Sequence, residues 1–321
     1  MSRRFQGKTI SQIRRQGIPK KDFLIKDVLQ NNDLALAYSK PGVGKTLLAG
    51  AWAALAVSGN SLCGKWKAQK PTSVFLFDTE MHLSTIEERL KAEFQHQGFD
   101  DIPDKDLQIF NRTANGGSIP DICNKRDREE LSNIFKGSEL VFLDSLSNMF
   151  RSGDDNAAQS WAEINEWLSD LRTRHTVVAL YHANKENDFR GSSKIGDVYD
   201  TIWVLGGLEK ERADSTSFFM QIEKDRNNIW GNQSAIGLTR NDPSSDRPLW
   251  ETCKVSKNPK AEQAMQMLLS GMSQQEIAEA LNVRKSTVSK WKYKAIEEGE
   301  IEESYGNRRW QKGEINDDIP F

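Results

Sequence analysis

The sequence has only three cysteines and lacks the long apolar run that a membrane span needs. Cys63, Cys123 and Cys253 are far apart and show no Cys-x-x-Cys spacing, which argues against a disulfide framework or a cysteine zinc site. No apolar core follows the basic N-terminal residues, so we expect no secretory signal. These absences predict a cytoplasmic protein in a reducing compartment, without membrane contact.

A large excess of charge of either sign is also missing. The chain has 44 Lys and Arg against 46 Asp and Glu, a formal net charge of −2. Such a chain has no overall attraction to nucleic acid, so any contact with DNA must come from local patches. Its 321 residues are enough for one large domain and one small one.

Short apolar runs alternate with amphipathic stretches from residue 33 onward. The expected strands cover 33–39, 73–79, 107–111, 140–145, 176–182, 201–206, 217–225 and 234–239. The expected helices cover 45–58, 84–96, 126–135 and 158–174. This alternation predicts an α/β domain whose mostly parallel sheet is covered on both faces. The later strands have no helices between them, which predicts an antiparallel portion at one side.

Changes in composition divide the chain into segments. We expect a basic N-terminal arm (1–30), the α/β domain (31–240), a linker (241–261), a small helical domain (262–312) and an acidic tail (313–321). Asn241, Asp242, Pro243 and Pro259 break regular structure in the linker.

A glycine-rich turn lies between the first apolar strand and the first helix. Its sequence, Ser39-Lys40-Pro41-Gly42-Val43-Gly44-Lys45-Thr46, is typical of a P-loop. The glycines allow the backbone to approach phosphate closely, Lys45 is expected to bridge the outer phosphates, and Thr46 to hold Mg²⁺. Ser39 stands where the usual motif has its first glycine. We predict that this loop binds ATP with Mg²⁺ through Ser39, Pro41, Gly42, Val43, Gly44, Lys45 and Thr46.

Three further residues follow apolar strands, at the sheet edge where ligands bind in such folds. Glu80 is a candidate for polarising the attacking water, although it also fits a helix-capping acid. Asp144 ends the run Leu140–Asp144 and is expected to orient the Mg²⁺ shell. His182 is expected to sense the γ-phosphate, with a hydrogen-bonded core histidine as the alternative.

Residues 33–240 resemble the RecA-like core, and more narrowly the hexameric helicases of the plasmid RepA and replicative DnaB groups. The P-loop, Asp78-Thr79-Glu80-Met81, Asp144, His182 and the segment 223–228 carry this resemblance. It implies that Lys224 and Arg226 reach into the nucleotide site of a neighbouring subunit, and therefore a homo-hexamer. A solvated charged turn is the alternative. The chain lacks the separate N-terminal helical domain of the DnaB type, which favours the RepA type.

Two segments after the strands are candidates for single-stranded DNA contact inside such a ring. Residues 184–194 combine cations, small hydroxyls, glycine and one aromatic, a composition that suits phosphate contacts. Lys185, Arg190 and Lys194 are the candidates there, and 148–156 around Arg151 is a weaker second loop. A surface loop without a ligand is the alternative.

The small C-terminal domain resembles the helix-turn-helix family, including winged forms. A capping box at Ser273 and Glu276 and an apolar set from Ile277 to Trp291 predict two short helices that pack across a tight turn. The expected recognition helix is 286–294, and 299–309 is the possible wing. A helical module for protein contact is the alternative. The candidates for duplex DNA contact are Arg284, Lys285, Ser286, Thr287, Ser289, Lys290 and Lys292.

The chain ends in Asp317-Asp318-Ile319-Pro320-Phe321. This end resembles the C-terminal tip of bacterial single-stranded-DNA-binding protein, whose terminal Phe enters an apolar pocket on replication and repair proteins. The resemblance implies docking of host proteins that bind this tip. An acidic tail without a partner is the alternative.

These features together predict an ATP-dependent DNA motor, a RepA-type replicative helicase of a plasmid, phage or other mobile element, that recruits host replication proteins. Two alternatives remain open: an ATP-gated DNA-binding regulator, and a recombination ATPase of the RecA or annealing type.

Overall fold

A computed structural model of the chain describes residues 7–17, 21–153, 158–183, 193–208, 214–231, 235–253, 255 and 259–297. The residues fall into two compact units that divide near residue 254. The larger unit contains a nine-stranded sheet, and the described part of the smaller one contains three helices.

The nine-stranded sheet has the order β13-β12-β11-β10-β3-β9-β8-β6-β7. The strands from β10 to β7 in this order are parallel to their neighbours, whereas β11, β12 and β13 add antiparallel pairs at one side. The strands are β3 (Leu34–Ser39), β6 (Val74–Asp78), β7 (Leu107–Asn111), β8 (Leu140–Asp144), β9 (Thr176–His182), β10 (Thr201–Gly207), β11 (Thr216–Asp225), β12 (Ala235–Arg240) and β13 (Trp250–Cys253).

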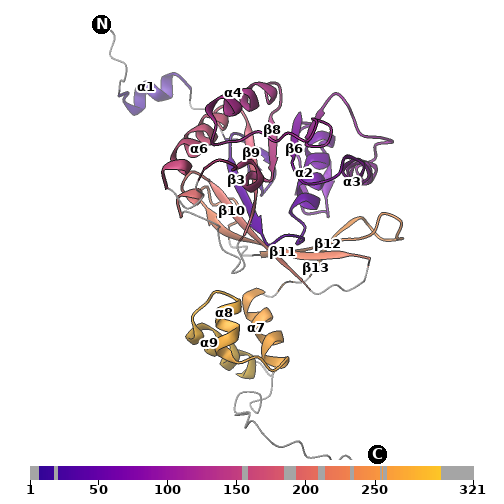
Figure 1. Cartoon of the computed structure of the whole chain (residues 1–321), viewed down its shortest axis with the longest axis vertical. Helices are drawn as coiled ribbons and strands as arrows, with labels where there is room; N and C mark the ends of the chain where they lie inside the picture. The colour runs from indigo at the N-terminus through magenta and orange to yellow at the C-terminus, as the bar shows by residue number, and fades with distance from the viewer. Residues whose placement is uncertain are drawn as a thin grey trace, which may run out of the picture. The chain divides into compact units, whose positions relative to one another are not determined.

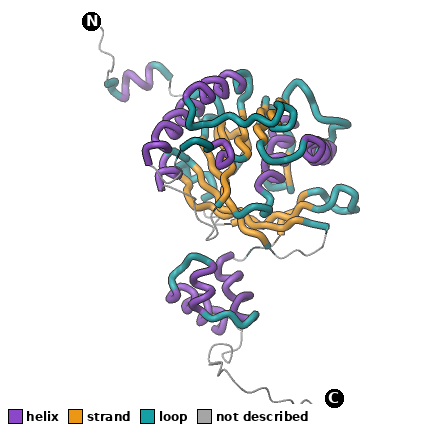
Figure 2. The backbone as a smooth tube through the Cα atoms, in the orientation of Figure 1, coloured by secondary structure: helices purple, strands orange, loops and turns teal. Residues whose placement is uncertain are grey.

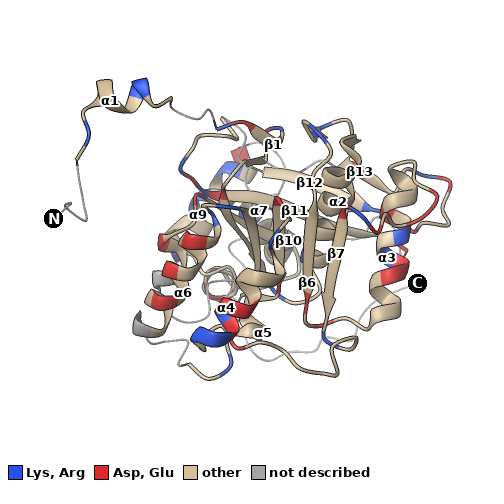
Figure 3. Cartoon of the chain, turned by 90° about the horizontal axis from the view of Figure 1, so that it is seen from above, with Lys and Arg blue, Asp and Glu red and all other residues tan. Residues whose placement is uncertain are grey.

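Helices cover both faces of this sheet, as Figures 1 and 2 show. One core joins α2 (Lys45–Ser58) and α3 (Leu83–His96) to one face, and a second core joins α4 (Lys125–Ile134), α5 (Leu146–Met149) and α6 (Ala158–Leu171) to the other. Alternate residues of β3 show the division, because Ala35 and Ala37 belong to the first core and Leu34 and Leu36 to the second. The central strands are therefore apolar except for polar residues at their ends, such as Asp78, Asp144 and His182, while charges gather on α3, α4 and α6 (Figure 3).

Smaller elements complete the larger unit. They are α1 (Ile10–Arg15), the hairpin of β1 (Phe23–Ile25) and β2 (Leu29–Gln30), the hairpin of β4 (Ser61–Leu62) and β5 (Trp66–Lys67), and the 3-10 helix η1 (Ser193–Asp197).

The predicted strands and helices of the large domain are confirmed within three residues at each end, as is the antiparallel portion. Two expectations need correction. Trp250–Cys253 forms β13, although the sequence predicted a linker there, and the β1–β2 hairpin lies in the expected N-terminal arm. Both elements are short, and their pairing with distant or flanking strands stabilises them more than their own pattern does.

The described residues of the smaller unit form α7 (Pro259–Leu269), α8 (Gln274–Ala280) and α9 (Lys285–Glu297). Its core includes Leu268, Ile277, Leu281 and Val288. The predicted capping box is confirmed: Glu276 N–H donates to Ser273 Oγ at 3.3 Å, and Ser273 N–H donates to the Glu276 carboxylate at 2.8 Å. The expected wing at 299–309 lies outside the described residues. Among the helices that the structure describes, none has the length and apolar character of a membrane span.

Candidate nucleotide site

The glycine-rich loop connects β3 to α2, the arrangement that the P-loop motif predicts. Gly42 and Gly44 have φ angles of 79° and 129°, which side chains rarely allow. The space at Gly44 is also closed, since an added Cβ would lie 2.8 Å from the ring of Phe218 in β11. The loop therefore rests on the antiparallel part of the sheet.

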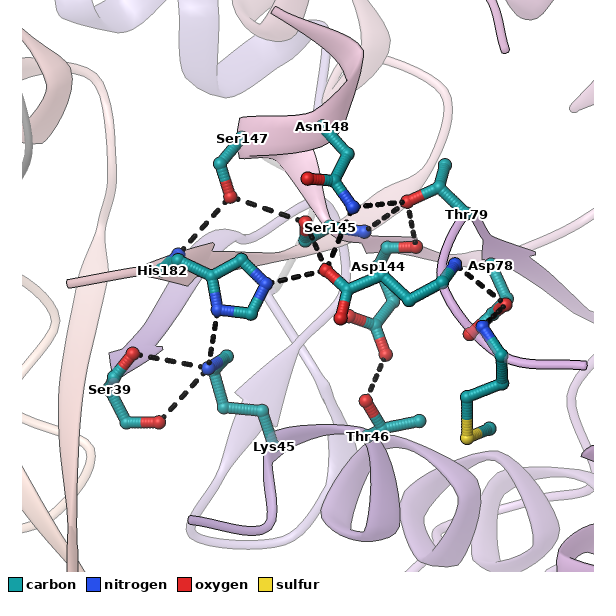
Figure 4. Close-up of polar contacts among 12 residues, drawn as sticks. Ser39, Lys45, Thr46, Asp78, Thr79, Asp144, Ser145, Ser147, Asn148 and His182 are labelled. Atoms are coloured by element: carbon teal, nitrogen blue, oxygen red, sulfur yellow. Dashed lines mark hydrogen bonds and ion pairs between the residues drawn. The ribbon is translucent and has the colours of Figure 1, made fainter. Parts of the chain in front are cut away.

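Lys45 is buried at the first turn of α2 and points back into the loop (Figure 4). Its Nζ donates to the Ser39 carbonyl oxygen at 3.1 Å and to Ser39 Oγ at 3.0 Å, and it lies 3.3 Å from His182 Nδ1. Burial lowers the pKa of Lys45, and the charges of Asp144 and Glu80 oppose that shift. Ser39 thus does more than replace a glycine, because its hydroxyl helps to hold the lysine.

Thr46 and Asp144 form the expected pair for a magnesium ion. Thr46 Oγ1 donates to Asp144 Oδ2 at 2.6 Å, and Asp144 is the last residue of β8. Asp144 is 1% exposed, and this burial raises the pKa of its carboxyl to about 7. A hydroxyl and a carboxylate are oxygen ligands of the kind that Mg²⁺ prefers, so these residues fit the ion.

Glu80 accepts three hydrogen bonds on Oε1. Ser145 Oγ donates at 2.8 Å and Asn148 Nδ2 at 2.9 Å, and His182 Nε2 lies 2.5 Å away. The bond from His182 is the largest cause that lowers the pKa of Glu80. Because Lys45 has only donors, His182 Nδ1 accepts and its Nε2 carries the proton. His182 therefore connects the P-loop lysine to the candidate general base.

Asp78 has a place in this site that the sequence analysis did not give it. Its Oδ1 accepts from the backbone N–H groups of Glu80 at 3.1 Å and Met81 at 2.9 Å, which fixes the turn that presents Glu80. Its Oδ2 is buried without a hydrogen-bond partner among the described residues. Burial raises the pKa of Asp78 to about 6. Its position in the sequence could have indicated this role, because Asp78 ends an apolar run just as Asp144 does. The structure places the two residues in register at the ends of β6 and β8.

Lys224 and Arg226 do not lie beside this site. Thr201 pairs with Ala35 at the start of β3 and with Asp225 at the end of β11, whereas the P-loop follows the opposite end of β3. The two cations are therefore at the amino-terminal edge of the parallel strands, and the P-loop is at the carboxyl-terminal edge. They can serve a nucleotide only on another copy of the chain.

The candidate DNA-contact residues differ in their exposure. In the α9 region Arg284, Lys285, Ser286 and Lys290 are exposed, and Thr287 and Ser289 are half-buried. Lys292 needs correction, because it is 8% exposed and lies on the buried side of α9 with Val288 and Ala295. Tyr293, which was not among the candidates, is 66% exposed on the same helix.

Several predicted residues lie outside the description. Lys185, Arg190, the side chain of Lys194 and the tail residues Asp317, Asp318, Ile319, Pro320 and Phe321 are among them. In the second candidate loop, Arg151 Nη1 donates to the Ile119 carbonyl oxygen at 3.0 Å, which ties this side chain to its own subunit.

Comparison with known proteins identifies the larger unit. The family described as AAA domain matches residues 3–188, more than half of the chain. Among solved structures, the flagellar accessory protein FlaH from Methanocaldococcus jannaschii is similar, with a TM-score of 0.49 and 11% sequence identity over 70% of this chain and 91% of that one. No curated protein matches significantly. The predicted α/β, RecA-like P-loop fold with additional C-terminal helices is confirmed.

Proposed function

The chain belongs to the AAA domain family of P-loop ATPases, and from this premise we propose that it is an ATP- and Mg²⁺-dependent DNA motor of the RepA helicase type. One observation carries the proposal. The P-loop half of the active site and the Lys224–Arg226 pair lie at opposite edges of one sheet, as a shared site between neighbouring copies requires.

The residues at the P-loop edge provide one half of a phosphoryl-transfer site. Lys45 and the loop N–H groups bind the phosphates, and Glu80 accepts a proton from the attacking water. Ser145, Asn148 and His182 hold the Glu80 carboxylate in place. Thr46 and Asp144 would hold Mg²⁺, which supplies positive charge to the phosphates when it is bound with ATP.

In this proposal, positive charge on the far side of the transferring phosphate comes from a neighbouring copy of the chain. Lys224 and Arg226 supply it when a neighbouring subunit presents its β11 end to the P-loop, and a finger of this kind raises the rate by roughly 10³–10⁵. A repeated contact of this sort joins unlike surfaces and closes into a ring, for which we propose a homo-hexamer.

Mixing two inactive variants tests the shared site. Lys45→Ala removes the P-loop lysine but keeps the fingers, and Arg226→Ala does the reverse. A 1:1 mixture is expected to recover up to about a quarter of the wild-type ATPase rate, because half of the P-loops work and half of their neighbours supply a finger. A mixture as inactive as its components would refute the trans finger, as would full activity of monomeric Arg226→Ala.

The exposed cations of α9 favour duplex DNA as a partner of the smaller unit, and single-stranded DNA is proposed for the ring. The same cations also fit the second candidate function, an ATP-gated DNA-binding regulator. Strand displacement on a forked duplex separates the two functions, since a motor unwinds the duplex and a regulator only binds it.

One electron-microscopy image with ATP and single-stranded DNA separates a ring from the filament of a recombination ATPase.

For the acidic tail we propose docking of host replication proteins that recognise the tip of single-stranded-DNA-binding protein. Deletion of 319–321 is expected to abolish binding to such partners and to leave the ATPase rate unchanged. Retained binding after this deletion contradicts the docking role.

A further inference from the structure

Asp200 is a buried carboxylate at the edge of the sheet where Lys224 and Arg226 lie. It is 2% exposed and immediately precedes β10. Arg226 Nη1 donates to Asp200 Oδ1 at 3.4 Å, and Arg226 Nη2 donates to the Asp197 carbonyl oxygen at 3.1 Å. The guanidinium is therefore held from two directions by one short segment.

The backbone fixes this segment in turn. Asp200 N–H donates to the Leu34 carbonyl oxygen at 2.8 Å, and Arg226 N–H donates to the Asp200 carbonyl oxygen at 2.8 Å. Asp200 Oδ2 also accepts from Leu34 N–H at 3.2 Å. The carboxylate is thus attached to the first residue of the P-loop strand and has little freedom to turn.

The same segment holds the second cation. Lys224 Nζ donates to the carbonyl oxygens of Gly196 at 2.8 Å and Asp197 at 3.3 Å. A bulge in β11 between the pairs Ile202–Lys224 and Trp203–Ile222 leaves Glu223 as the extra residue, directly before Lys224. Both candidate fingers therefore depend on residues 196–200 for their direction.

Asp200 does not neutralise Arg226 completely. Arg172 Nη2 lies closer, 2.9 Å from Asp200 Oδ2, so two guanidinium groups share one carboxylate and the cluster keeps a net positive charge. The Arg226 side chain is 49% exposed. Its guanidinium has five N–H donors, more than its contacts to Asp200 and Asp197 use, so an outer edge remains for a phosphate.

We propose that Asp200 is a positioning residue that orients Arg226 for the ATP bound by the neighbouring subunit. This inference rests on the proposed trans finger. A long arginine side chain has many rotamers, and fixing it before the reaction removes the entropy loss that ordering would otherwise add to the barrier. Because Asp200 acts through Arg226, it does not touch the substrate.

The test uses Asp200→Asn in the full-length chain, alone and in 1:1 mixtures. Alone, this variant is expected to lower kcat by roughly 10- to 100-fold and to leave the KM for ATP within about twofold and the oligomer size unchanged. The reason is that a misplaced Arg226 guanidinium affects mainly the transition state. Mixed with Lys45→Ala, which supplies intact fingers, it should regain activity. Mixed with Arg226→Ala it should show no gain, because both changes damage the finger side.

Asp33→Asn is the matched control. Asp33 is equally buried at the same edge, and it accepts from Gln30 N–H at 2.7 Å and Asn227 Nδ2 at 3.2 Å while also pairing with Lys21. Asp33 contacts neither Lys224 nor Arg226, so the kcat of the Asp33→Asn variant should stay within about twofold of wild type.

The outcomes separate this inference from the proposed function. If Lys45→Ala with Arg226→Ala regains activity but Lys45→Ala with Asp200→Asn does not, Asp200 acts on its own P-loop strand and the inference is wrong. A raised KM with unchanged kcat overturns it too. If neither mixture regains activity, the trans finger itself fails. Should Asp200→Asn unfold, Arg172→Leu/Asp200→Asn also removes the guanidinium nearest to the lost carboxylate, leaves Arg226 with its Asp197 contact, and undergoes the same mixtures.

Discussion

At the scale of single residues, Gly44 is the position of the nucleotide loop with the least room. Its φ angle of 129° opposes a side chain, and so does the Phe218 ring, which would lie 2.8 Å from the methyl group of an alanine. We expect Gly44→Ala to lower the free energy of unfolding by about 2–4 kcal/mol, the sum of backbone strain and overpacking, and to abolish ATP binding.

Gly42→Ala is the matched control for this prediction. Gly42 has a φ angle of 79°, but an added Cβ would meet nothing within 4 Å. Gly42→Ala should therefore lower the free energy of unfolding only by the backbone strain, about 1 kcal/mol. Urea unfolding of the two variants measures the difference, and equal costs would show that Phe218 does not restrict the loop.

Asp78 should make stability depend on pH. Its carboxyl has a pKa of about 6 in the folded chain against an ordinary value of 3.8, so the native state holds the proton more tightly than the unfolded chain does. The stability that this proton contributes is present below about pH 4 and is lost as the pH rises through 6, a change of roughly 3 kcal/mol. Asp78→Asn cannot ionise, so relative to wild type it should gain roughly 2 kcal/mol between pH 4 and pH 8.

Urea unfolding at these two pH values, without nucleotide, measures the effect of Asp78→Asn. A constant difference between variant and wild type would contradict the raised pKa of Asp78. The expected effect arises from burial of the Asp78 carboxyl. A hydrogen bond to Oδ2 would favour the ionised form, but this atom has no such partner among the described residues.

At the scale of elements, α3 is fastened to the antiparallel side of the sheet by one buried carboxylate. Arg240 Nε of β12 donates to Glu93 Oε1 at 2.8 Å, and Trp250 Nε1 of β13 donates to Glu93 Oε2 at 2.7 Å. Burial raises the pKa of Glu93, and both contacts oppose that shift. The strand that the sequence did not predict, β13, is thus held by a residue 157 positions away.

Glu93→Ala should lower the free energy of unfolding by about 3–5 kcal/mol, because it leaves Arg240 and the Trp250 indole buried without their partner. Glu87→Ala, an exposed change on the same helix, should cost less than about 0.5 kcal/mol. Thermal or urea unfolding compares them. A Glu93→Ala cost as small as that of Glu87→Ala would show that the contact does not hold β12 and β13 to α3.

At the scale of the whole molecule, a net charge of −2 makes the proposed DNA binding depend on where the cations lie. Lys290→Ala should reduce the slope of log affinity against log salt concentration by about 0.9, since each exposed lysine that meets a phosphate releases one counterion. Lys292→Ala should leave the slope unchanged because Lys292 is buried. Fluorescence anisotropy with duplex DNA at several salt concentrations measures both slopes, and equal slopes would place the phosphate contacts elsewhere.

Much of the large domain could be predicted because its signals are local. Runs such as residues 140–143 of β8 are buried on both faces of a parallel sheet, so they are apolar throughout and stand out in the sequence. The P-loop needs its glycines, lysine and threonine at fixed spacing. By contrast, β13 is a four-residue strand beside turn-forming residues, and only its pairing with β12 makes it a strand.

The sequence by itself therefore determined the fold class and the P-loop, and it named Glu80, Asp144 and His182 because each follows an apolar strand. Only the tertiary structure brought His182 between Lys45 and Glu80, gave Asp78 its place, and turned Lys292 inward. It also decided that Lys224 and Arg226 lie at the opposite edge of the sheet from their own P-loop. The physical reason is that periodicity reports which residues are buried, whereas strand order and register decide which distant residues meet.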